Sequence, residues 1–305
     1  MATTHTTSYS LSLQSAEERL LTIGLSLLAL ALLGSVFDGA ITLGVQQLLQ
    51  LRLNAHGHTH LYAHGHPFVD ARSFWGIPNA LDVLSNLPFA VGGLWGLCWL
   101  RVSQQATALP RQARAAATVF FAGLVLTCLG SSYYHWAPTA WGLAIDRAGM
   151  AVAFAGVLGL VAVDKVSLRA APVVWASMLL AAALAIGINY AAGWVLAWVV
   201  VQFGGMAVVL WACRQHSIST GLTVRWGVLI GLYALAKLLE LGDEAVFHAA
   251  QGWVSGHTLK HVVASFAALP VILAILSPRT KRPLASYGRH VPTCLPNSAE
   301  RDIMR

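Results

Sequence analysis

The last apolar run of the chain opens with Ser255-Gly256-His257-Thr258-Leu259-Lys260-His261 and continues to residue 277. An apolar run of about 20 residues can cross a bilayer as one helix. His257 and His261 are four residues apart, so a helix places both rings on one face. Two imidazoles in that arrangement can bind the same metal ion. The stretch therefore predicts a membrane helix with two metal ligands at its start.

The whole chain has the composition of a membrane protein. Of its 305 residues, 57% are hydrophobic and only 10% are charged, whereas a soluble domain has about 25% charged residues. The formal net charge is +7, but the basic residues lie in loops and in the tail beside apolar runs, where membrane topology places them. We therefore predict an all-α, polytopic membrane protein that is surrounded by membrane lipids and has no nucleic-acid partner.

Apolar windows of about 20 residues predict the helices. Seven such windows predict a seven-helix transmembrane bundle over residues 79–277: 79–100, 115–135, 142–163, 171–189, 192–213, 225–247 and 257–277. An eighth apolar run, Leu20–Phe37, predicts an additional N-terminal transmembrane helix. A cleaved signal peptide is the alternative, but no small-residue cleavage motif follows this run.

Three segments outside the apolar runs are polar: residues 1–19, a loop at 38–78, and a basic tail at 278–305. The loop contains a histidine-rich stretch, Asn54–His66, with five histidines. Two interpretations stay open for this stretch, a metal-capturing segment and a solvated loop with loose metal affinity. Its glycines favour the flexible loop.

The loop charges predict the orientation in the membrane. The basic residues of alternate connections and of the tail are Arg101, Arg111, Arg114, Lys165, Arg169, Arg214, Arg225, Arg279, Lys281 and Arg282. The intervening loops, 136–141, 190–191 and 248–256, contain no Lys or Arg. Because basic loops face the cytoplasm, we predict a cytoplasmic C-terminus. The ends of the helices that carry the histidines then lie near the outer, periplasmic or luminal, side.

A third histidine lies at the same predicted depth. His135 ends the 115–135 run, four residues after Ser131. Three neutral imidazoles with an open fourth position are the ligand set of a hydrolytic zinc site, which predicts zinc bound by His135, His257 and His261. Ser131 could then donate to a carbonyl oxygen as its charge builds. Asp146 could take a proton from the attacking water; pairing with Arg147 or a helix cap is the alternative.

Other polar residues lie at helical spacing in the apolar runs. Lys237 and Glu240 are deep enough to need a partner, and an ion pair that holds the bundle is favoured over a proton path or a headgroup contact. Asp243 is nearer the surface and could line the access to the site. Asp82 could orient a ligating histidine through its far ring nitrogen, whereas Ser85 is typical of interhelical hydrogen bonds.

These motifs together resemble the alkaline ceramidase family, part of the CREST group of seven-helix membrane hydrolases. The matching pieces are Asp82-Val83-Leu84-Ser85-Asn86, Ser131-x-x-x-His135 followed eleven residues later by Asp146, and Ser255-Gly256-His257-x-x-x-His261. The resemblance covers about residues 70–280. It implies a zinc ion held by the three histidines, with Ser131 and Asp146 assisting the attack of water on a lipid amide such as that of ceramide. It also implies that Leu20–Phe37 is an addition to the seven-helix core.

The chain departs from the family before the first core helix. Eukaryotic members carry an acidic calcium-binding stretch there, whereas this chain has His56–Asp70 and then Ala71-Arg72-Ser73-Phe74-Trp75, with Asn79 where a glutamate is expected. Asp70 and Asp82 are the remaining candidate oxygen ligands for calcium. This departure leaves both the calcium site and the substrate headgroup open.

Two other classes of protein stay open. The first is a receptor-like or structural seven-helix protein in which zinc holds the helices together and turnover is small. The second is an ion-coupled transporter that uses Lys237, Glu240 and Asp243. The transporter leaves the convergence of three histidines unexplained.

Overall fold

The computed structural model describes residues 16–31, 37, 68–218, 220 and 222–277. Its named elements are all helices, and the only extended pairing among the described residues is a single bridge between Phe74 and Ile77. The all-α prediction is confirmed. Residues 16–31 are helical, which covers the first part of the predicted helix Leu20–Phe37. The histidine-rich stretch Asn54–His66 and the tail at 278–305 lie outside the described residues.

Seven helical segments follow one another between residues 80 and 276 of the described part, in the predicted order, and four of them are interrupted. Their bounds are α2 Ala80–Leu84 with α3 Leu87–Val102, α5 Arg111–Trp136, α6 Ala140–Lys165, α7 Ala170–Ala192, α8 Leu196–Val199 with η1 Val200–Gly204 and α9 Gly205–Ala212, α10 Trp226–Leu241 with α11 Asp243–Ala249, and α12 Gly256–Ser265 with α13 Ala268–Leu276. A short helix, α4 (Gln104–Thr107), links α3 to α5.

Five of these segments are long and apolar enough to cross a membrane. They are Ala80–Val102, Arg111–Trp136, Ala140–Lys165, Ala170–Ala192 and Gly256–Leu276. The segment Leu196–Ala212 is also apolar but shorter. The chain is therefore a polytopic membrane protein, as its composition predicts.

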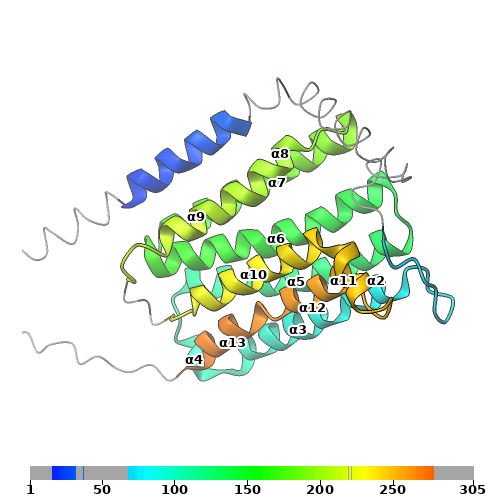
Figure 1. Ribbon diagram of the computed structural model, residues 1–305. Helices are drawn as coiled ribbons and strands as arrows, with labels where there is room; N and C mark the ends of the chain where they lie inside the picture. The colour runs from blue at the N-terminus through cyan, green and yellow to red at the C-terminus, as the bar shows by residue number, and fades with distance from the viewer. Residues whose placement is uncertain (1–15, 32–36, 38–67, 219, 221, 278–305) are drawn as a thin grey trace, which may run out of the picture.

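Helix α6 lies at the centre of the bundle. It packs against α5, α7 and α9, and Figure 1 shows α5, α6, α7 and α10 running along one another. About 72% of the apolar window of α6 is buried, against 22% for α7, so α7 faces outward. At Gly130 a Cβ atom would lie 2.7 Å from the carbonyl oxygen of Ile145. Only glycine permits this approach, which brings the end of α5 close to Asp146.

Proline accounts for two of the interruptions. Proline lacks an N–H group and its ring clashes with the carbonyl four residues earlier, so it breaks a helix there. Pro88 breaks the first segment after Leu84, and α3 begins at Leu87. Pro270 acts in the same way on the carbonyl of Phe266, the residue where α12 gives way to α13. The first and last segments of the bundle are therefore both kinked along their length.

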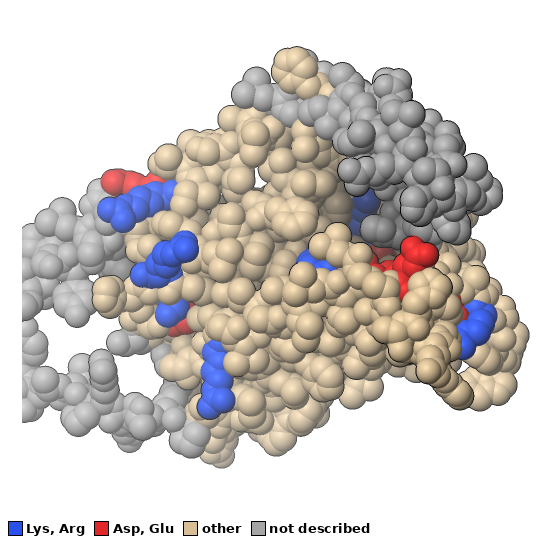
Figure 2. All heavy atoms as spheres, in the orientation of Figure 1, with Lys and Arg blue, Asp and Glu red and all other residues tan. Residues whose placement is uncertain are grey.

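Basic residues gather in the connections at one end of the bundle. These are the α3–α5, α6–α7 and α9–α10 connections. Figure 2 shows Lys and Arg side chains gathered at this end, whereas acidic and basic side chains are both visible toward the other end, where α2 and α11 lie. The basic connections agree with the alternation of charge between successive loops of the sequence.

Candidate metal centre

Three histidines from two helical segments meet at the end of the bundle that holds α2 and α11. His135 lies in the last turn of α5, and His257 and His261 lie in the first turns of α12. Their ring nitrogens lie within 4.8 Å of one another, and all three side chains are buried. The Nε2 atoms of His135 and His257 are 3.2 Å apart. The predicted convergence is confirmed; the role of these side chains as metal ligands stays a prediction.

The first turn of α12 is held by side chains from two elements. The Ser255 hydroxyl oxygen accepts a hydrogen bond from the Thr258 N–H group at 2.9 Å, and Asp243 Oδ1 accepts one from the His257 N–H group at 2.7 Å. These contacts pair two of the N–H groups that the start of a helix leaves open. A Cβ atom at Gly256 would lie 2.2 Å from the carbonyl oxygen of Leu239, so glycine lets α12 pack directly on the end of α10. Asp243 thus caps α12; that it also lines the access to the site stays a prediction.

A serine hydroxyl contacts the far nitrogen of a candidate ligand. Ser85 Oγ lies 2.9 Å from His261 Nδ1, and its hydroxyl also donates to the Asp82 carbonyl at 3.1 Å. With that donation, the Ser85 oxygen accepts from Nδ1–H of His261, and Nε2 is left to bind a metal. Asp82 accepts instead from the Thr258 hydroxyl at 2.7 Å. The Asp82 carboxylate therefore bonds to Thr258, whereas the Asp82 backbone carbonyl is a hydrogen-bonding neighbour of the His261 ring. That Asp82 orients a ligating histidine stays a prediction.

Ser131 and Asp146 lie beside one another near the histidines. Ser131 is on α5, one turn before His135, and its hydroxyl is a hydrogen-bonding neighbour of the Asp146 carboxylate. Asp146 is buried in α6. Among the described residues no ion pair joins it to Arg147, whose guanidinium donates to Asn189 and lies 5.3 Å from the Trp198 ring centre. The pairing of Asp146 with Arg147 that the sequence left open is not formed.

Three buried carboxylate oxygens have no hydrogen-bond partner in the described part of the structure. They are Oδ2 of Asp82, Oδ1 of Asp146 and Oδ1 of Asp164, and all three side chains are buried. An unpartnered polar atom in an apolar interior is unfavourable by several kcal/mol in the limit of complete desolvation. These atoms are therefore expected to receive a hydrogen bond from water or from a ligand.

The segment before α2 covers the histidines. The Phe68 ring centre lies 4.8 Å from that of His135 and 6.1 Å from that of His257. Arg72 binds both carboxylate oxygens of the buried Asp70, each at 2.7 Å, and this hydrogen bonding raises the pKa of Arg72. Arg72 also donates to the Trp253 carbonyl at 3.0 Å. The Asp70 oxygens proposed for calcium are thus occupied by a guanidinium, which does not fit a calcium site.

A chain of three charges joins α10 to α12. Glu240 accepts from Lys237 and from Lys260, each at 2.6 Å. The side chains are 14–27% exposed, so this cluster lies largely inside the bundle. The Lys237–Glu240 pair was predicted, but the partnership of Lys260 was not. The sequence does carry a signal for this partnership. Lys260 lies between His257 and His261, so on a helix its side chain cannot point to the same side as both rings and needs another partner.

Comparison with models of protein families, with curated proteins and with solved structures found no match for this chain. The fold and the site define a polytopic helical membrane protein with a buried group of three histidines. This group has the geometry of a possible metal site.

Proposed function

We propose that this protein is a zinc-dependent membrane hydrolase that cleaves the amide bond of a lipid such as ceramide, giving a fatty acid and a sphingoid base. The observation that carries the proposal is the meeting of three buried histidines next to the Ser131–Asp146 pair. The resemblance of the same motifs to the alkaline ceramidase family supports this chemistry.

The donor set suits zinc. Tetrahedral zinc with Zn–N distances of about 2.0–2.1 Å holds its nitrogen ligands about 3.3 Å apart. The His135 and His257 Nε2 atoms are at 3.2 Å, and the widest separation in the group is 4.8 Å, so a small inward movement would complete the set. The Ser85 contact to His261 Nδ1 is the type of support that metal-binding histidines have. Three nitrogen ligands leave a fourth position open, as hydrolytic zinc sites require.

The residues of the chain then have separate tasks. Zinc in this site would supply Lewis-acid polarisation and lower the pKa of a bound water to about 7. Asp146 takes the proton of the attacking water and delivers it to the amide nitrogen, so that the C–N bond breaks and a carboxylic acid and an amine leave. Ser131 donates to the carbonyl oxygen as negative charge builds on it. The proximity of Ser131 to Asp146 allows both to act on one amide.

A lipid is the substrate class that the surroundings favour. The histidines lie among helices that are long and apolar enough to cross a membrane, and Phe68 covers two of the rings. A substrate with a hydrocarbon chain is stabilised by the apolar helices and reaches the site from the bilayer. From the positive-inside rule we propose that the C-terminus lies in the cytoplasm and the site near the outer side.

The test is hydrolysis of a panel of N-acyl lipids by the purified protein and by two matched variants. His257→Ala removes a proposed ligand, whereas His248→Ala removes an exposed histidine that pairs with Glu244 on its own helix. We expect His257→Ala to lose bound zinc and amide hydrolysis, and His248→Ala to retain both. Amide hydrolysis by a metal-free His257→Ala protein would contradict the proposal.

A further inference from the structure

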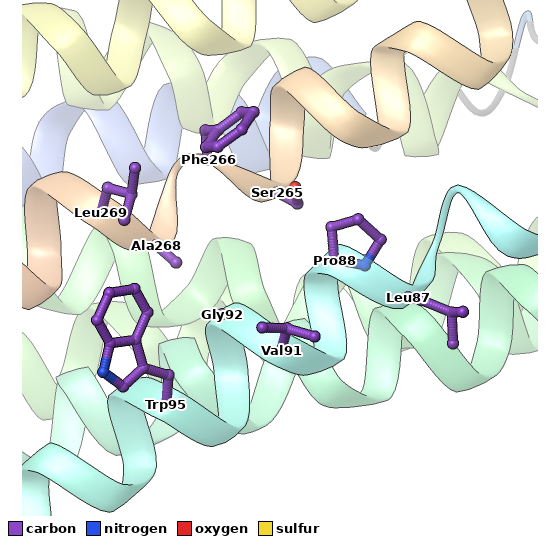
Figure 3. Close-up of a pocket in the computed structure, with 9 residues that line it drawn as sticks. All are labelled: Leu87, Pro88, Val91, Gly92, Trp95, Ser265, Phe266, Ala268 and Leu269. Carbon is purple, nitrogen blue, oxygen red and sulfur yellow. The ribbon is translucent and has the colours of Figure 1, made fainter.

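An apolar groove lies between α3 and the α12–α13 segment (Figure 3). Its volume is about 310 Å³. The lining residues are Leu87, Pro88, Val91, Gly92, Trp95, Ser265, Phe266, Ala268 and Leu269. The one hydroxyl among them, that of Ser265, donates to the Val262 carbonyl of its own helix at 2.6 Å. The groove therefore offers a nearly continuous hydrocarbon surface.

The groove lies where two helices are broken. Pro88, which breaks the first segment, is part of one wall, and Phe266, where Pro270 ends α12, is part of the other. A broken helix changes direction, and two breaks on facing helices leave space between them. Because proline fixes both breaks in the backbone, the groove does not depend on the rotamer of one side chain.

The groove begins next to the metal centre. Ser265 follows His261 by one helical turn on α12, and Leu87 follows Ser85 by two residues on the facing segment. One turn of four residues advances about 6 Å along a helix. Phe89, one residue after Pro88 of the groove wall, is buried, and its ring centre lies 6.4 Å from that of His261. A chain lying in the groove would thus have its polar end close to His261.

The position of the groove determines which kind of ligand can occupy it. Both walls belong to segments that are long and apolar enough to cross the membrane, and Val91 and Phe266 are 64% and 49% exposed on this face. Only hydrocarbon is available there in a bilayer. We propose that the groove holds one hydrocarbon chain of the lipid amide whose polar end reaches the three histidines. The identity of that lipid rests on the proposed function.

Photolabelling tests where the chain lies. The probes are an N-acyl sphingoid base and a phosphatidylcholine, each with a diazirine in one acyl chain, added to the full-length protein in phosphatidylcholine vesicles. We expect the amide probe to label the peptides that contain Val91 and Phe266, and unlabelled N-acyl sphingoid base to compete. Equal labelling of these peptides by the phosphatidylcholine probe, or labelling of other helices by the amide probe, would overturn the proposal.

A matched pair of variants tests whether the groove contributes to binding. Val91→Trp fills it, whereas Val173→Trp places the same ring at an equally exposed position on α7; the two valines are 64% and 65% exposed. If the tryptophan excludes about two methylenes of the hydrocarbon chain from the groove, binding of the lipid amide weakens by about tenfold. We expect that loss in competable labelling for Val91→Trp and no change for Val173→Trp. Equal behaviour of the two variants would overturn the proposal.

The outcomes separate this proposal from the proposed function. Competable labelling of the groove without amide hydrolysis would support the chain-binding site and count against a hydrolase. Hydrolysis that Val91→Trp leaves unchanged, with labelling elsewhere, would overturn the groove and leave the hydrolase standing.

Discussion

Ser85 and His261 are joined by a 2.9 Å contact between Oγ and Nδ1, although 176 residues separate them in the sequence. One helical turn away, Asp82 and Thr258 are joined by a hydrogen bond of 2.7 Å. The two contacts are three residues apart on each helix, so the start of the first segment and the start of α12 run in parallel register. This pair of contacts sets the rotation of the helix that carries two of the three histidines.

Removal of the Ser85 hydroxyl should weaken zinc binding. We expect Ser85→Ala to lower zinc affinity by about 10–100-fold, as loss of a supporting hydrogen bond to a ligating histidine does, whereas Ser85→Thr keeps the hydroxyl and most of the affinity. Competition with a zinc-binding dye measures this. The matched control is Ser132→Ala, which removes a hydroxyl that donates to the Val83 carbonyl. Equal zinc affinity in Ser85→Ala and the wild type would contradict the assignment.

Replacement of Asp146 by asparagine should separate metal binding from turnover. Asparagine keeps the shape of the side chain but cannot take a proton, so we expect kcat to fall by about 10²–10⁴-fold. Zinc content should stay at the wild-type level. Steady-state hydrolysis of an N-acyl lipid and metal analysis of the same sample check both statements. Unchanged physiological function with Asp146→Asn would favour the receptor-like or structural class.

Neutralising Glu240 should destabilise the bundle. Glu240→Gln leaves Lys237 and Lys260 facing each other without the carboxylate that binds both. We expect a loss of about 1–3 kcal/mol in the free energy of unfolding, seen as a lower Tm in detergent. Glu244→Gln is the control, because Glu244 is 67% exposed. If Glu240→Gln instead abolished a metal-independent ion flux and left Tm unchanged, the transporter class would be favoured.

The predicted orientation of the chain in the membrane can be tested by cysteine labelling. Glu244→Cys lies at the end of the bundle with the histidines and Arg169→Cys at the start of α7, each in a chain whose four native cysteines are replaced by alanine. A membrane-impermeant maleimide added to intact cells should label only Glu244→Cys, since basic connections face the cytoplasm. Labelling of Arg169→Cys alone would reverse the topology.

The helices and the meeting of the histidines could be predicted because both depend on local signals. The length of an apolar run predicts a helix that crosses the membrane. Helices α6 and α7 cover their predicted windows, with ends that differ by a few residues. Alternating loop charge places His135 and the start of α12 at the same end, and the structure brings them within 4.8 Å. The breaks at Pro88 and Pro270 also have a sequence signal, since proline interrupts a helix.

The contacts between helices could not be predicted, because they depend on axial register. A slide of one turn would exchange the Ser85 and Asp82 side chains as neighbours of His261, and no spacing within one helix distinguishes these choices. The link between Lys260 and Glu240 joins residues 20 positions apart across two packed helices. The pairing of Arg72 with Asp70 occurs in a loop, where helical spacing says nothing.

The most direct test of the central claim is hydrolysis of an N-acyl sphingoid base by the purified protein while bound zinc is removed by a chelator and then restored. We predict one zinc per chain in the active protein, loss of hydrolysis in proportion to zinc removed, and recovery when zinc is added back. Full hydrolysis by protein that contains no metal would contradict the claim.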